Sequence, residues 1–226
     1  MSAQADTRRP RHKRRIDSLT IIALLPPALL LLLLPGTLAY GMLRPQQHIL
    51  ALRASPLRAL LVGGGPDPAH NQVAIESNIR YVHHLLPAGA ISRILFTDGN
   101  PRSVNVQYEA ASGHTLYRRP RLPALDGPSR LASFDTAFRA VTAHSSGPLL
   151  LYFTGHGGPA ANGGYDNNEY DMWGGDLLTV KRLAAHIDTL PPRTPVVVVM
   201  VECFSGGFGN LLFAGGDPDG PVTDKD

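Results

Sequence analysis

Cys203 and His156 are the residues whose types and spacing could do chemistry. Cys203 is the only cysteine of the 226 residues and follows the uncharged apolar run 196–201 and then Glu202. His156 lies in "TGHGG", directly after the apolar run 149–153 and Thr154-Gly155. Only a small fraction of a free thiol is thiolate at neutral pH, so a nucleophilic cysteine needs a base. An imidazole supplies one and can then protonate a leaving amine, so the pair predicts acyl transfer through a thioester.

Two other interpretations of these residues stay open. Cys203 could be an inert buried thiol, and His156 could be a structural histidine. Their positions at the ends of apolar runs, each beside glycines, favour the chemical interpretation. Glycine allows the backbone to approach a substrate closely, so that N–H groups can stabilise a developing oxyanion.

Apolar runs and amphipathic segments alternate along the chain and would position this pair. Runs ended by small or polar residues predict buried strands beginning at Arg58 and at 94–96, 149–153 and 196–201. Apolar residues at helical spacing predict helices within 71–86, 129–144 and 178–190, the last with Thr179 as N-cap. We expect residues 98–128 to form a loop, with a local strand near 104–108, and the segment after His156 to be irregular.

This alternation predicts an α/β fold, a three-layer α-β-α sandwich with a mainly parallel sheet. Strands that are apolar throughout are typical of a parallel sheet whose two faces are covered by helices. Ligands bind beyond the carboxyl ends of such strands. Because adjacent strands lie about 4.8 Å apart, His156 and Cys203 would face each other at that edge.

The N-terminal segment predicts export. Residues 1–15 carry six Lys or Arg and one Asp, and the chain has a net charge of +3, so residues 16–226 carry +3 − 5 = −2. The basic segment precedes the almost wholly apolar stretch 19–34, so residues 1–39 are predicted to be a signal peptide or a signal anchor. Both alternatives place the folded part outside the cytoplasm, secreted or periplasmic after cleavage or held at the membrane. A near-neutral body gives no basic face for nucleic acid.

The motifs around His156 and Cys203 resemble those of a known family. "LLLYFTGHGG" followed by "VVVVMVECFSGGF" resembles the caspase–hemoglobinase fold of cysteine peptidases, most closely the branch of legumain and the catalytic subunit of the GPI transamidase. "RALLVGGG", a helix and "SRILFTD" resemble the family's first strand–helix–strand unit, so that the likeness covers about residues 57–214. The resemblance implies that Cys203 is the nucleophile, His156 the acid/base, and the backbone amides of Gly157 and Cys203 the oxyanion hole. It implies no cofactor.

The sequence departs from the family in two places. Glu202 directly precedes Cys203, where legumain-like sequences have a small residue between the acid and the cysteine. The loop "GGGPDPAHNQ" lacks the arginine with which those enzymes build the pocket for the residue before the cut bond. No preference for asparagine therefore follows.

Residues around the pair are predicted to form the rim of a substrate cleft. The acidic loop "GYDNNEYDMWGGD" follows His156 and contributes Asp166, Glu169 and Trp173, and Ser205 follows the cysteine. A cation site from Asp166, Glu169 and Asp171 is the alternative, but the loop lacks the spacing of a calcium-binding loop, so a solvated loop with no metal is favoured. The histidines near the first helix are expected to be surface groups; they are His70, His83 and His84.

The C-terminal part predicts an exposed sheet edge. We assign residues 40–57 to a linker, 58–214 to the peptidase-like domain and 215–226 to a disordered tail. "FGNLLF" is expected to form a short helical turn, and no later segment has a pattern that could pair with 196–201. The sequence therefore predicts a C-terminally incomplete domain whose open strand needs a second copy or a partner chain to cover it.

Together these patterns predict an exported cysteine peptidase that hydrolyses peptide bonds of a peptide or protein substrate. A transpeptidase or transamidase of the same fold differs only in using an amine as acceptor. A catalytically weak pseudo-peptidase, acting as an interaction module at the membrane surface, is the non-enzymatic alternative. Its membrane contact would run through the uncleaved N-terminal segment.

Overall fold

The computed structural model describes residues 55–143 and 147–225. The predicted signal peptide or anchor and almost all of the predicted linker lie outside the described residues. Within the described ranges no helix has the length and apolar character needed to cross a membrane.

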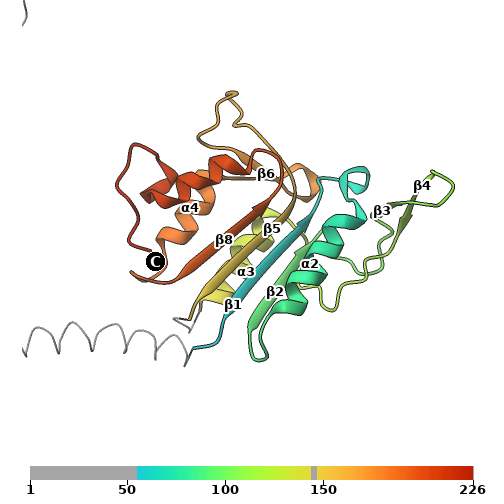
Figure 1. Cartoon of the computed structure of the whole chain (residues 1–226), viewed down its shortest axis with the longest axis horizontal. Helices are drawn as coiled ribbons and strands as arrows, with labels where there is room; N and C mark the ends of the chain where they lie inside the picture. The colour runs from blue at the N-terminus through green and yellow to red at the C-terminus, as the bar shows by residue number, and fades with distance from the viewer. Residues whose placement is uncertain (1–54, 144–146, 226) are drawn as a thin grey trace, which may run out of the picture. The chain divides into compact units, whose positions relative to one another are not determined.

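A sheet of parallel strands forms the centre of the fold (Figure 1). Its strands are β1 (Arg58–Gly64), β2 (Ile91–Phe96), β5 (Leu149–Gly158) and β8 (Val196–Val201). β1 pairs with β2 on one side and β5 on the other, and β8 pairs with the far side of β5. The strands predicted from the apolar runs are therefore confirmed, as is the prediction that the strands carrying the histidine and the cysteine are neighbours.

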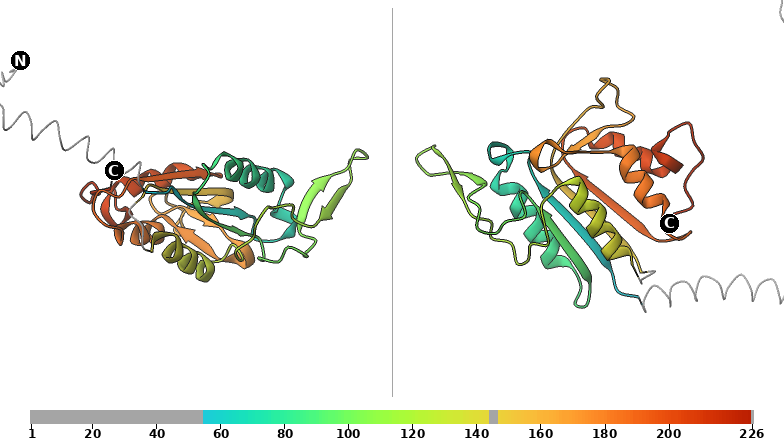
Figure 2. Two further views of the ribbon diagram at one scale, coloured as in Figure 1. Left: turned by 90° about the horizontal axis from the view of Figure 1, so that it is seen from below. Right: turned by 180° about the vertical axis from the view of Figure 1, so that it is seen from behind.

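Helices cover both faces of this sheet (Figure 2). α2 (Val73–Leu85) packs Ile75 and Ile79 into an apolar cluster on one face. α3 (Leu131–Thr142) and α4 (Val180–Asp188) contribute to a second cluster that contains Phe134, Phe138 and Leu183. The helices predicted from apolar spacing are confirmed, and the chain is an α/β protein with a mostly parallel sheet.

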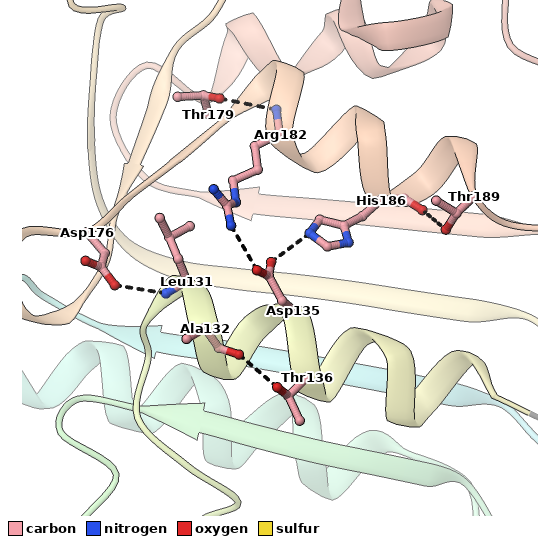
Figure 3. A network of polar contacts seen from close by, with 9 residues as sticks. All are labelled: Leu131, Ala132, Asp135, Thr136, Asp176, Thr179, Arg182, His186 and Thr189. Carbon is pink, nitrogen blue, oxygen red and sulfur yellow. Dashed lines mark hydrogen bonds and ion pairs between the residues drawn. The ribbon is translucent and has the colours of Figure 1, made fainter.

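Polar contacts fix α4, the helix that precedes the cysteine strand (Figure 3). The Thr179 hydroxyl accepts the backbone N–H of Arg182 at 3.2 Å, which confirms the predicted N-cap. Asp135 on α3 accepts hydrogen bonds from the Arg182 guanidinium at 2.9 Å and from His186 Nε2 at 2.8 Å. The Asp135 carboxylate of α3 therefore binds side chains from two successive turns of α4.

The segment after His156 is more ordered than the sequence predicts. β6 (Glu169–Asp171) pairs antiparallel with the last residues of β5, and β7 (Leu177–Thr179) pairs antiparallel with β6. The prediction of a solvated, irregular loop is therefore wrong for these residues. The sequence did not indicate the strands because three residues are too few to show a period of alternating apolar residues. β3 (Val106–Glu109), near the expected local strand, pairs antiparallel with β4 (Thr115–Arg118), which the sequence did not predict.

The residues after the cysteine fold back onto the sheet. The predicted helical turn is present as the 3-10 helix η4 (Ser205–Leu212), which is followed by η5 (Ala214–Gly216). Phe213 and Val222 form an antiparallel bridge, and the Lys225 ammonium donates to the Leu190 carbonyl at 2.9 Å. The predicted disordered tail is therefore wrong as far as Lys225.

β8 forms an edge of the parallel sheet. Among the described strands, only β5 pairs with it, which confirms the predicted open edge. Val197 and Val201 face the α2 side of the sheet and are 57% and 42% exposed.

Candidate active site

The carboxyl ends of β5 and β8 bring the histidine and the cysteine together. The last paired residues of the two strands are Thr154 and Val201, so His156 and Cys203 each follow two residues beyond the end of this pairing. A Cβ atom added to Gly157 would lie only 2.7 Å from the Cys203 carbonyl oxygen, so the two backbones are in contact. Cys203 itself is exposed in the turn that follows β8.

His156 faces the side of the sheet that α2 covers. Two residues before it, Thr154 accepts a hydrogen bond from the Asn78 amide of α2 at 3.0 Å. Side chains alternate along a strand, so His156 lies on the same face as Thr154. Its Nε2 atom lies 2.9 Å from Oε1 of Gln72, the N-cap residue of α2.

Gln72 selects the tautomer of the neutral imidazole. An amide oxygen can only accept a hydrogen bond, so Nε2 of His156 donates to Oε1, and in the neutral imidazole the lone pair is then on Nδ1. The imidazole therefore presents a basic nitrogen on the side away from Gln72. The sequence analysis missed Gln72, because a glutamine in the loop before a helix carries no signal of its own.

Replacing Gln72 by alanine is expected to lower kcat by about 100-fold, because a small misplacement of a catalytic group has an effect of that size. Gln72→Glu keeps an oxygen for His156 and should recover part of the loss. Gln107→Ala is the matched control, since this side chain makes no hydrogen bond within the described residues although its backbone bridges that of Gln72. Equal kcat values for Gln72→Ala and Gln107→Ala would show that Gln72 does not orient His156.

His70 flanks His156. The two rings lie edge to face, with centroids 5.8 Å apart. The His70 side chain is 56% exposed, as predicted, and its Nδ1 atom lies 2.8 Å from the Asp67 carboxylate. This hydrogen bond lowers the pKa of Asp67. A second imidazole therefore lies at the rim of the candidate site. The position of His70 shortly after β1, at the carboxyl edge of the sheet, is the sequence feature that could have indicated this.

Asp171 is the carboxylate that β6 brings beside the pair. It lies opposite His156 in the antiparallel pairing of β5 and β6. Burial raises its pKa, while the positive charge that His156 or His70 can carry acts in the opposite direction. An ionised Asp171 would stabilise an imidazolium that forms at His156. The β5–β6 pairing, which positions this carboxylate, was not predicted.

Glu202 lies on the other side of the sheet from His156. Val198 and Met200 pack towards α3 and α4, and the alternation continues to Glu202. Both of its carboxyl oxygens are buried and have no hydrogen-bond partner among the described residues. Burial raises the pKa of Glu202 from 4.5 to about 8. The residue next to the thiol is therefore a neutral acid at pH 7.

Replacing Glu202 by glutamine is expected to remove a pH-dependent part of the stability. The folded state holds this proton up to about pH 8, whereas the unfolded chain releases it near pH 4.5. Between these values the folded state binds more protons, so the free energy of unfolding falls as pH rises and levels off above the folded pKa.

Denaturant unfolding of both proteins across this pH range measures the difference. Glu202→Gln should lose stability less steeply than the wild type as the pH rises. Parallel curves would show that burial does not raise the pKa of Glu202 as described.

The residues predicted to form the rim lie in different elements. Glu169 begins β6, Trp173 begins the 3-10 helix η3 (Trp173–Gly175), and Ser205 begins η4. Asp166 is exposed, and its carbonyl accepts a hydrogen bond from the Asn210 amide at 3.0 Å. Their contact with a substrate stays a prediction. In residues 55–143 and 147–225, no three His, Cys, Asp or Glu side chains are grouped as metal ligands would be.

We compared the chain with known protein families, curated proteins and solved structures. Neither a protein-family model, nor a curated protein, nor a solved structure matches the chain. Fold and site together define an α/β protein with a cysteine and a histidine at the carboxyl edge of a mostly parallel sheet.

Proposed function

We propose that the chain is an exported cysteine peptidase with a caspase-like α-β-α sandwich, related in type to the caspase–hemoglobinase enzymes. The observation that carries the proposal is the parallel pairing of β5 with β8, because the chain leads from the carboxyl ends of these two strands into His156 and Cys203. Two further features support it. Nε2 of His156 lies 2.9 Å from Oε1 of Gln72, and Cys203 is exposed.

In the proposed reaction, Cys203 Sγ attacks the carbonyl carbon of a peptide bond. Nδ1 of His156 takes the thiol proton as the C–S bond forms and then delivers it to the leaving amine as the C–N bond breaks. Water attacks the resulting thioester, His156 takes its proton, and the thiolate leaves and is reprotonated. Backbone N–H groups of Gly157 and Cys203 would stabilise both oxyanions.

Labelling with a panel of peptidyl electrophiles, read by mass spectrometry, tests the proposal. Modification should fall on Cys203 and should depend on the peptide sequence of the probe. Iodoacetamide, which has no peptide part, is the control for plain thiol reactivity. If Cys203 reacts with every probe at the rate of a free peptide thiol, the peptidase proposal is wrong and a non-enzymatic role is favoured.

Product analysis separates hydrolysis from transpeptidation. A peptide that is cut should give a free carboxylic acid even when an amine nucleophile is added. Conversion of most of the product to the amide would show instead that the thioester is transferred to an amine.

A further inference from the structure

An open groove of about 740 Å³ lies along the outer side of α2. One wall comes from α2 and the other from the segment that follows β4 (Figure 1 shows α2 and the β3–β4 hairpin). The lining side chains are Ser77, Arg80, Tyr81, His83, His84, Arg121, Leu122 and Pro123. None of them is acidic, and nothing in the proposed reaction uses them.

Two arginines in this groove are free to bind an anion. Glu76, one turn before Arg80 on α2, is fully buried and forms an ion pair with Arg118. Glu76 also accepts the backbone N–H of Arg121, which fixes the second wall of the groove. The Arg80 and Arg121 side chains are exposed and make no ion pair or hydrogen bond within the described residues. No ion pair among residues 55–143 and 147–225 therefore neutralises their charge.

The other lining groups suit a polypeptide. Tyr81 is 65% exposed, and Leu122 and Pro123 add apolar surface next to the guanidinium groups. Aromatic, apolar and cationic groups in one groove match an extended chain that carries acidic side chains. Nucleic acid would require a broad basic face, but residues 16–226 carry a net charge of −2, from +3 for the chain less +5 for residues 1–15.

The groove lies within reach of a substrate at the active site. Gln72, which contacts His156, caps the N-terminus of α2, and the groove residues follow it on the same helix. A rise of 1.5 Å per residue puts Ser77 and His84 roughly 8 and 18 Å along the axis from Gln72. An extended peptide covers that distance in roughly two to five residues.

We propose that this groove binds an acidic segment of the polypeptide substrate, roughly two to five residues from the bond that is cut. The inference rests on the proposed peptidase function. It assigns that function a substrate class: polypeptides with Glu or Asp on one side of the cleavage site. Binding through exposed charges weakens as salt rises, so the preference should be strongest at low ionic strength.

Direct binding tests the groove without requiring turnover. The full chain with Cys203→Ala is titrated into a fluorescein-labelled peptide with three glutamates, and into the same peptide with glutamines, and anisotropy is measured. The acidic peptide should bind about tenfold tighter at about 50 mM NaCl, and the difference should shrink at about 300 mM.

Matched charge variants locate the binding. Arg80→Gln with Arg121→Gln, in the Cys203→Ala chain, should abolish the preference for the acidic peptide. Arg139→Gln with Lys181→Gln removes the same charge from α3 and α4, on the other face of the sheet, and should leave it intact. Equal effects of the two pairs would overturn the proposal, as would stronger displacement of the acidic peptide by single-stranded DNA than by its unlabelled form.

Kinetics then separate this proposal from the proposed function. With Cys203 present, the double variant Arg80→Gln, Arg121→Gln should have a KM about tenfold higher than the wild type for a substrate with the acidic segment, and an unchanged kcat. The wild type and this double variant should cut a short neutral substrate equally well. An unchanged KM for the acidic substrate would contradict the groove, whereas loss of all cleavage in the wild type would contradict only the peptidase function.

Discussion

Replacing Cys203 by alanine is expected to abolish both electrophile labelling and turnover. No other thiol exists in the chain, so no second group can form the thioester. Replacing His156 by alanine should lower turnover by about 10²- to 10⁴-fold, the range that a positioned general acid–base contributes. Alkylation of Cys203 at neutral pH should be slower in His156→Ala than in the wild type, because the imidazole no longer takes up the thiol proton.

His114→Ala is the control for loss of a histidine. This residue is exposed beyond β3 and hydrogen-bonds to Ser112, so its removal should leave the kinetics unchanged. Alkylation rates that are the same in wild type, His156→Ala and His114→Ala would show that Cys203 and His156 do not act as a pair.

Replacing Gly157 by alanine is expected to damage both stability and activity. The added Cβ would lie 2.7 Å from the carbonyl oxygens of Cys203 and Glu169, and 2.8 Å from Cγ of Glu202. Two of these atoms belong to backbone and cannot rotate away, so β6 or the cysteine turn must move. Overpacking of this kind costs about 3 kcal/mol at the upper end of its usual range, and a shift of about 1 Å in a catalytic group can lower turnover about 100-fold.

Gly158→Ala provides a control one residue away. A Cβ at Gly158 meets no atom within 4 Å, and its backbone is not left-handed. Urea unfolding and peptide turnover should therefore separate the two substitutions clearly. If Gly157→Ala is as stable and active as Gly158→Ala, the close packing of Cys203 against β5 is not maintained in solution.

Much of the central sheet could be predicted because its strands contain continuous apolar runs. The run 196–201 and the glycines after Val62 give such a signal, and the register of β5 with β8 then follows from ordinary parallel pairing. The hairpin β6–β7 could not be predicted, since Tyr170 and Leu178 are single buried residues in strands of three. The apolar run predicted a strand over 149–153 only, whereas β5 continues to Gly158 and its last three residues pair with β6.

The candidate site was predictable only in part, because some of its residues have no signal in the local sequence. Cys203 and His156 are indicated by their own chemistry and by the strands that precede them. Gln72 and Asp171 acquire a role only through partners that are distant in the sequence, a helix N-terminus and a short antiparallel pairing. Their residue types are common in surface loops, so nothing in the local sequence distinguishes them.

The position of Glu202 also affects how the protein behaves in concentrated solution. Natural sequences often flank a β-prone apolar run with charged gatekeeper residues, whose repulsion keeps open strand edges of different molecules apart. Glu202 directly follows the run 196–201 at the open edge of β8, but its raised pKa of about 8 leaves it uncharged at neutral pH. Near pH 7 this acid therefore gives the open edge none of the charge repulsion that a gatekeeper residue normally supplies.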